Sequence, residues 1–177
     1  MITRAQALGT WILIVLMLVL AAGQSWGTFL VADSAGGGSL GISGFSGFPV
    51  IGTLIALQTV TILATLLVRP IVIRIVAGLL VPFMIWNFTD VLVTADSRVR
   101  ETFVRVIAEQ TGVMQDVSSS EFLLASSNSL FPWVYLGAVA MNIGFLCSIA
   151  ALPLKSKAVA SAEKDRDLPE DLWGNQK

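Results

Sequence analysis

The sequence predicts an all-α integral membrane protein, a bundle of about four transmembrane helices with an extracytoplasmic amphipathic helical segment. Of its 177 residues, 55% are hydrophobic and only 13% are charged, a composition outside the range of ordinary soluble domains. The apolar residues are also gathered into four runs, each close to the roughly 20 residues that a helix needs to cross a bilayer. Lipid is therefore the expected surrounding of most of the chain.

Composition excludes several functional classes. The net charge is −1, so no basic surface for a nucleic acid is expected. With the single cysteine Cys147 and no histidine, the chain can form neither an internal disulfide, nor a Cys/His metal site, nor a histidine-based catalytic pair. No spacing pairs the candidate acids and bases, which are Asp90, Glu101, Glu109 and Glu121. We expect no enzyme activity, no cofactor and no metal.

The expected domain organisation is a membrane domain over residues 1–154 and a cytoplasmic, disordered charged tail over residues 155–177. The first span also fits a cleaved signal peptide, because Arg4 precedes it and small residues follow it, but we favour an uncleaved anchor. The spans are expected at 8–22, 48–68, 71–93 and 130–154, with outer segments at 24–47 and 94–129.

Basic residues near span ends indicate the orientation, because they favour the cytoplasmic side. They predict a multi-pass protein of the cell membrane with both termini in the cytoplasm. The residues that support this are Arg4, Arg69, Arg74, Lys155 and Lys157, whereas segment 24–47 has no basic residue. Counting against it are Arg98, Arg100 and Arg105 in the second outer segment.

Tryptophan favours the level of the lipid headgroups, so interface anchors are expected at Trp11 on the inner side and at Trp26, Trp86 and Trp133 on the outer side.

The two outer segments differ in pattern. Segment 24–47 contains Gly36-Gly37-Gly38 and further glycines, which predicts a flexible loop. In segment 94–129, apolar residues recur at helical spacing and predict a short amphipathic helix that lies on the membrane or caps the bundle; they are Val99, Phe103, Val106 and Ile107. A second short helix is expected where Ser118-Ser119-Ser120-Glu121 precede Phe122, Leu123 and Leu124.

Polar side chains inside a bilayer need a partner or a purpose, so they are the candidate substrate-binding residues. Gln58 and Asn142 fall at similar depth near the midplane and are placed to hydrogen-bond. Asn87 and Asp90 lie three residues apart on one helical face near the outer end, with expected partners for Asp90 at Gln24, Ser25, Arg98 or Arg100. The alternative is that these residues only hold the helices together.

Two further features predict helix packing. Ala140, Gly144 and Ser148 form a ridge of small residues that permits close helix contact. Pro82 removes a hydrogen bond inside the third span and is expected to kink it.

The order of several short stretches resembles the actinobacterial tryptophan-biosynthesis-associated membrane proteins, a family of small four-span proteins. The resemblance rests on Leu20-Ala21-Ala22-Gly23-Gln24-Ser25-Trp26, Ile42-Ser43-Gly44, Phe48-Pro49-Val50-Ile51, Leu66-Leu67-Val68-Arg69-Pro70, Arg74-Ile75-Val76-Ala77-Gly78 and the tail sequence Asp171-Leu172-Trp173. It implies a link to tryptophan metabolism and carries over no catalytic residue.

Two functions follow as expectations. The first is assistance in the transport or sensing of tryptophan or another aromatic amino acid, with tryptophan as the small-molecule ligand. The second is a non-transporting scaffold or assembly subunit that binds partners through the outer amphipathic segment and the acidic tail. Expected partners are the lipid bilayer and either a second copy of the chain or another membrane protein.

Overall fold

The computed structural model describes residues 4–32, 37–65, 67, 70–111 and 123–151. The expected tail and the expected helix start at Ser118–Glu121 lie outside these residues. The elements in chain order are α1 (Arg4–Gly23), β1 (Ser25–Val31), β2 (Gly38–Ser43), α2 (Gly44–Gly47), α3 (Pro49–Ala64), α4 (Pro70–Thr111), β3 (Leu123–Asn128) and α5 (Phe131–Ala151).

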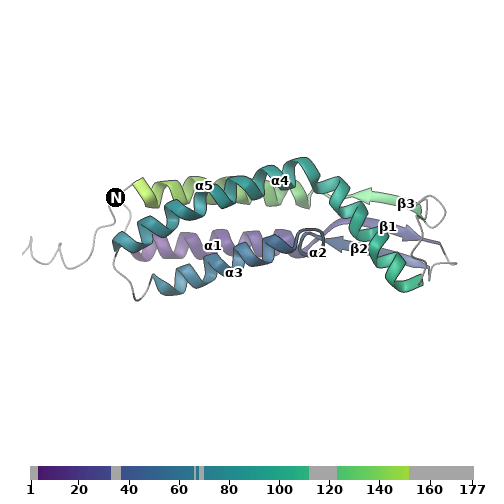
Figure 1. Cartoon of the computed structure of the whole chain (residues 1–177), viewed down its shortest axis with the longest axis horizontal. Coiled ribbons are helices and arrows are strands. Elements are labelled where there is room, and N and C mark those ends of the chain that lie inside the picture. The colour runs from purple at the N-terminus through teal and green to yellow at the C-terminus, as the bar shows by residue number, and fades with distance from the viewer. Residues whose placement is uncertain (1–3, 33–36, 66, 68–69, 112–122, 152–177) are drawn as a thin grey trace, which may run out of the picture.

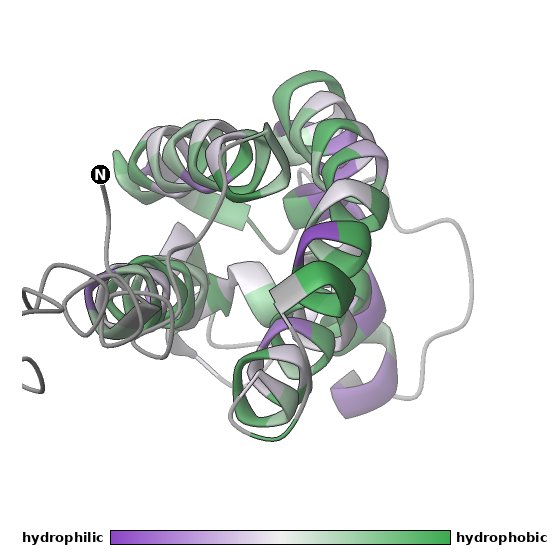
Figure 2. Ribbon diagram, turned by 90° about the vertical axis from the view of Figure 1, so that its left-hand side faces the viewer, coloured by the Kyte–Doolittle hydropathy of each residue, from purple (hydrophilic) through white to green (hydrophobic). Residues whose placement is uncertain are grey.

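Four long helices form an elongated bundle with a small sheet at one end (Figure 1). In the bundle, α5 packs against α4 and α1, while α3 packs against α1 and α4. The helices lack strong amphipathicity because they are apolar nearly all round, as expected for helices that face lipid on one side and each other on the other. Figure 2 shows this as predominantly hydrophobic colouring of the long helices.

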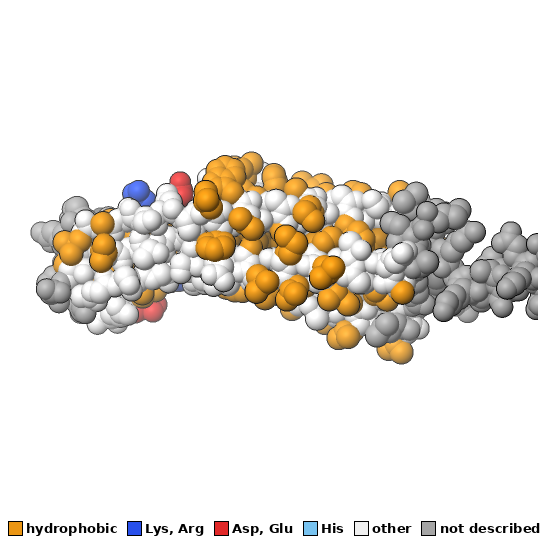
Figure 3. Space-filling model, turned by 180° about the vertical axis from the view of Figure 1, so that it is seen from behind, with side chains coloured by type: hydrophobic (Ala, Val, Ile, Leu, Met, Phe, Trp, Pro, Cys, Tyr) orange, Lys and Arg blue, Asp and Glu red, His pale blue; other side chains and the backbone are white. Residues whose placement is uncertain are grey.

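Three described helices are long and apolar enough to cross a membrane: Ala5–Gly23, Ile71–Gln110 and Phe131–Ala151. The second expected span is shorter than predicted, because α3 ends at Ala64 and has 16 residues. Exposed apolar side chains occur on all four long helices and gather on the face of the bundle seen in Figure 3, and these residues fit a lipid-facing surface far better than a water-facing one. The described part of the chain is thus mostly helical, and three of its helices could cross a membrane by their length and composition.

The outer segments correct the expectation of an all-α fold. Within segment 24–47, strands β1 and β2 pair antiparallel and helix α2 follows, and β3 pairs antiparallel with the other edge of β1, giving the order β2-β1-β3. Leu123 and Leu124, expected to begin a helix, belong to strand β3. Two of the glycines that suggested flexibility instead allow close packing: a Cβ on Gly41 would lie 2.7 Å from the hydroxyl oxygen of Ser25, and one on Gly44 would lie 2.5 Å from two ring carbons of Trp26.

The expected amphipathic helix is not a separate element. It is the last part of α4, which runs without interruption from Pro70 to Thr111. Val99, Phe103 and Ile107 are buried, and the ring of Phe103 stacks on that of Phe29 in β1 at 4.4 Å between centroids. This apolar face therefore covers the sheet and does not lie on the membrane. We call the sheet, α2 and residues 95–111 of α4 the cap.

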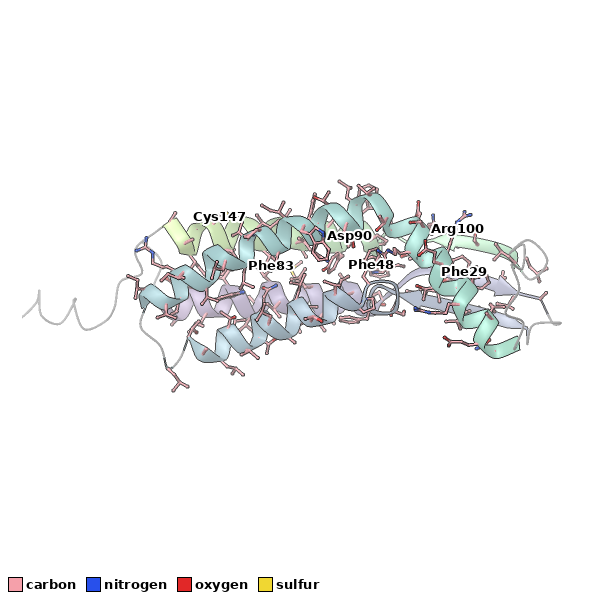
Figure 4. The ribbon with its side chains drawn as sticks, in the orientation of Figure 1. Phe29, Phe48, Phe83, Asp90, Arg100 and Cys147 are labelled. Carbon is pink, nitrogen blue, oxygen red and sulfur yellow. The ribbon has the colours of Figure 1, made fainter. Side chains whose placement is uncertain are left out.

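Two expected packing features also differ. Pro82 lies within α4, but the marked change of direction of that helix lies further on, between Asp90 and Arg100, where α4 turns across the sheet (Figure 4). Of the expected tryptophan anchors, Trp86 and Trp133 are exposed at 54% and 66%, whereas Trp11 and Trp26 are buried at 1% each. The latter two are core residues because each indole N–H finds an acceptor inside the protein.

Candidate functional site

A polar network lies at the centre of the bundle, among the predicted site residues. The side-chain amide of Asn142 in α5 donates a hydrogen bond to Oε1 of Gln58 in α3 at 2.7 Å, which confirms the expected pairing. The same oxygen accepts a hydrogen bond from Nε1 of Trp11 in α1 at 3.1 Å, and Nε2 of Gln58 lies 3.4 Å from the sulfur of Met84 in α4. Gln58 thus joins all four long helices from a fully buried position.

The indole of Trp11 fixes the orientation of every amide in this network. An indole N–H only donates, so the Gln58 atom facing it must be the oxygen. That oxygen then requires the nitrogen of Asn142 to face it, which turns Oδ1 of Asn142 the other way. Oδ1 is buried and has no hydrogen-bond partner among the described residues. The unpartnered acceptor therefore follows from the network itself and cannot be removed by exchanging the N and O atoms of one amide.

The other two predicted site residues have separate partners. Asn87 is buried and accepts a hydrogen bond from the hydroxyl of Tyr135 in α5 at 2.8 Å. Asp90 is half-buried, and its carboxylate meets the hydroxyl of Thr94, one turn later on the same helix, at 3.4 Å.

The polar cluster expected around Asp90 is therefore not formed. The expected partners of Asp90 were Gln24, Ser25, Arg98 and Arg100. In the part of the chain that the structure describes, none of them forms a hydrogen bond or an ion pair with the Asp90 carboxylate. The bend of α4 explains this in part, because it carries Arg100 away from Asp90 toward the sheet (Figure 4). The four predicted residues are divided among the midplane network, the Asn87–Tyr135 pair and Asp90.

The small-residue ridge of α5 faces outward. Ala140 and Gly144 are exposed, Ser148 is half-buried, and a Cβ placed on Gly144 would meet nothing within 4 Å. Among the described residues the ridge does not make the close helix contact that the sequence predicted, because α5 buries the face that carries Asn142 and Leu146.

A cavity of about 200 Å³ lies at the junction of the bundle and the cap. It is bounded by the bend of α4, by β1, and by the connection from β3 into α5. Its walls combine aromatic side chains with charged and polar ones: Trp26, Phe29, Trp133, Asp96, Arg100 and Asn128. We call it the junction cavity.

Two opposite charges stand at the rim of the junction cavity. Asp96 and Arg100 are four residues apart on α4, hence one turn apart on the same side of the helix. Both are exposed, and neither belongs to an ion pair among the described residues. A carboxylate and a guanidinium at this spacing are placed to receive the two charges of a zwitterion.

Local hydrogen bonds hold the wall of the cavity in place. The backbone N–H and the hydroxyl of Ser129 both donate to the carbonyl of Trp26 at 3.1 Å, joining the end of β3 to β1. The Ser129 hydroxyl also accepts from the N–H of Phe131, the first residue of α5, at 3.3 Å. Trp26 is fixed in turn, because its indole donates to the carbonyl of Ala21 at 2.9 Å and packs on Phe48 and Tyr135.

The sequence prediction missed this cavity. None of the four predicted site residues lines it. The sequence signal that could have indicated it is the four-residue spacing of Asp96 and Arg100. This spacing places the two charges on one side of a helix only if the third span continues as one helix beyond Val93.

No protein-family model, no curated protein and no solved structure matches this chain.

Proposed function

We propose that this is a four-span membrane protein that binds a zwitterionic aromatic amino acid, with tryptophan as the first candidate, in the junction cavity, in the service of its transport or sensing. The observation that carries the proposal is the unpaired Asp96 and Arg100, one helical turn apart at the rim of a cavity walled by Trp26, Phe29 and Trp133.

The chemistry of the cavity matches both parts of such a ligand. A guanidinium binds the α-carboxylate through paired hydrogen bonds, and a carboxylate attracts the α-ammonium. Aromatic walls favour an offset or edge-to-face arrangement with the ligand ring. The volume of about 200 Å³ is below the roughly 300–1,000 Å³ of drug-sized sites, so the occupant is a single small molecule. The resemblance noted in the sequence points to the same ligand class.

The ligand's two charges provide a test. Purified wild-type protein is expected to bind radiolabelled tryptophan. Tryptamine, which lacks the carboxylate, and indole-3-propionate, which lacks the ammonium, should each compete at least about tenfold more weakly than unlabelled tryptophan does. Arg100→Gln should abolish the advantage of tryptophan over tryptamine, and Asp96→Asn its advantage over indole-3-propionate.

The matched control for these variants is Glu109→Gln, which removes a charge from the exposed surface of α4 outside the cavity lining and should leave binding unchanged. Wild-type protein that binds none of the three compounds, or variants that bind tryptophan as well as the wild type does, would contradict the proposed site. Unchanged tryptophan uptake and export after deletion of the gene would contradict the proposed physiological role.

The proposed topology places the cap outside and both chain termini in the cytoplasm. In support, the start of α1, the end of α3, the start of α4 and the end of α5 lie at the end of the bundle opposite the sheet (Figure 1). Helix α3 is the shortest of the four long helices. Its 16 residues span about 24 Å, which is less than a hydrocarbon core of about 30 Å. Bordering residues and local thinning of the bilayer accommodate a difference of this size.

Cysteine labelling tests the topology. In a Cys147→Ser background, Ser39→Cys in exposed β2 should react with a membrane-impermeant maleimide in intact cells, whereas Ser161→Cys should react only after permeabilisation. Reaction of both from the same side would rule out the arrangement.

The alternative function, a non-transporting scaffold or assembly subunit, is favoured by one observation. The outward-facing ridge at Ala140 and Gly144 leaves a helix surface on which another transmembrane helix can approach closely. Of the two surfaces expected to dock partners, the amphipathic segment has its apolar face buried against the sheet, and the acidic tail lies outside the described residues. Cross-linking from Gly144→Cys in membranes distinguishes the two roles. If the protein is recovered solely as monomer, with no cross-linked product, the result counts against the scaffold.

A further inference from the structure

A second hollow lies on another side of α4, where the cap meets the start of α3. Its volume is about 350 Å³, and the residues around it include Ser46, Pro49, Arg98, Glu101, Thr102 and Arg105. It shares no lining residue with the junction cavity. We propose that this hollow binds the phosphate of an anionic phospholipid headgroup, an inference that rests on the membrane insertion proposed above but not on the amino-acid ligand.

The charges of the hollow favour an anion. Arg98 and Arg105 are seven residues apart, about two turns, and so lie on the same side of α4. Both are exposed and belong to no ion pair among the described residues, although Glu101 lies between them. The two guanidinium groups exceed the single carboxylate in charge, and a guanidinium fits phosphate oxygens through paired hydrogen bonds.

A free hydroxyl adds a donor. The hydroxyls of Thr59, Thr61, Thr89 and Thr94 each donate to the carbonyl four residues earlier in their helices. Thr102 is 6% exposed and lines the hollow, yet its hydroxyl makes no hydrogen bond with the described residues. Its donor therefore remains available to a phosphate oxygen. Ser46 differs, because its hydroxyl is already engaged with Ser43 in the cap of α2.

The position of the hollow favours a lipid over a free phosphate. Pro49 at its edge begins α3, whose following residues expose apolar side chains at Val50, Leu57 and Val60. On α4 the closely spaced exposed apolar residues continue to Val93, whereas from Asp96 onward charged residues predominate and Val104 is the one exposed large apolar residue among those described. The hollow thus lies where the apolar surface gives way to charge, so a lipid with its phosphate here would run its acyl chains along α3.

Native mass spectrometry of the full chain released from detergent with added phosphatidylglycerol tests the inference. Wild-type protein should retain phosphatidylglycerol, and Arg98→Gln with Arg105→Gln should weaken retention about tenfold, since each basic residue near an anionic headgroup contributes severalfold. Glu101→Gln should instead strengthen it, an effect of the opposite sign that a poorly folded variant would not produce. The matched control is Arg100→Gln, on the side of the junction cavity, which should retain phosphatidylglycerol and lose only tryptophan selectivity.

The outcomes separate the two proposals. Equal retention by wild type and by the Arg98→Gln/Arg105→Gln protein, or no gain with Glu101→Gln, would overturn the lipid site whatever the result for tryptophan. Inorganic phosphate that displaces phosphatidylglycerol at millimolar concentration would assign the hollow to a free anion and equally overturn the lipid assignment.

Discussion

Replacement of Gly44 by alanine is expected to destabilise the protein by about 2–3 kcal/mol, the cost of forcing extra atoms into a closely packed core. A Cβ on Gly44 would lie 2.5 Å from two ring carbons of Trp26. The indole cannot move aside easily, because its N–H donates to the Ala21 carbonyl and its ring packs on Phe48 and Tyr135.

Gly47→Ala is the matched control for Gly44→Ala. It lies in the same helix α2, is also buried, and its Cβ would meet Val99 at 3.9 Å, an ordinary contact. Thermal unfolding in detergent, followed by tryptophan fluorescence, should show a clearly lower midpoint for Gly44→Ala and little change for Gly47→Ala. Equal midpoints for the two variants would show that Trp26 is not held as the structure has it. Because Trp26 also walls the junction cavity, Gly44→Ala should weaken tryptophan binding as well.

The second large effect is expected for Gln58→Leu. The change removes the oxygen that accepts from both Trp11 and Asn142, leaving two buried donors without a partner. Hydrogen bonds between membrane helices average about 0.6 kcal/mol and reach about 1.7 kcal/mol, so the loss of both predicts destabilisation of about 1–3 kcal/mol.

Asn142→Leu provides the comparison that makes this prediction specific. It breaks one of the same hydrogen bonds but also removes Oδ1 of Asn142, an acceptor that is buried without a partner. It should therefore be milder than Gln58→Leu, and the double variant should be less destabilised than the sum of the two single variants. Free energies of unfolding measured in lipid bicelles would check this order. An Asn142→Leu protein less stable than Gln58→Leu would mean that Oδ1 has a partner within the folded protein.

The sequence anticipated part of the candidate sites. Depth along apolar runs placed Gln58 opposite Asn142, and the structure joins them. The depth of Trp11 along its span did not predict its hydrogen bond to Gln58. The two residues are 47 positions apart on different helices, and the preference of tryptophan for the membrane interface suggested another position. The same limit applies to Asp90, because its expected partner Arg100 lies beyond a bend of α4 that hydropathy does not indicate.

The sequence by itself determined the apolar helices, the polar residues within them and the amphipathic pattern of 99–107, because each depends on the order of side chains along one helix. Only the tertiary structure decided the rest. Strand β1 pairs with β3 about a hundred residues away, as Gly27 opposite Asn128 shows, and neither strand has the strict alternation of apolar and polar residues that would indicate such pairing. Which face of α5 is buried was also decided by its neighbours, because a helix that is apolar all round has no sequence mark that separates the face toward lipid from the face toward protein.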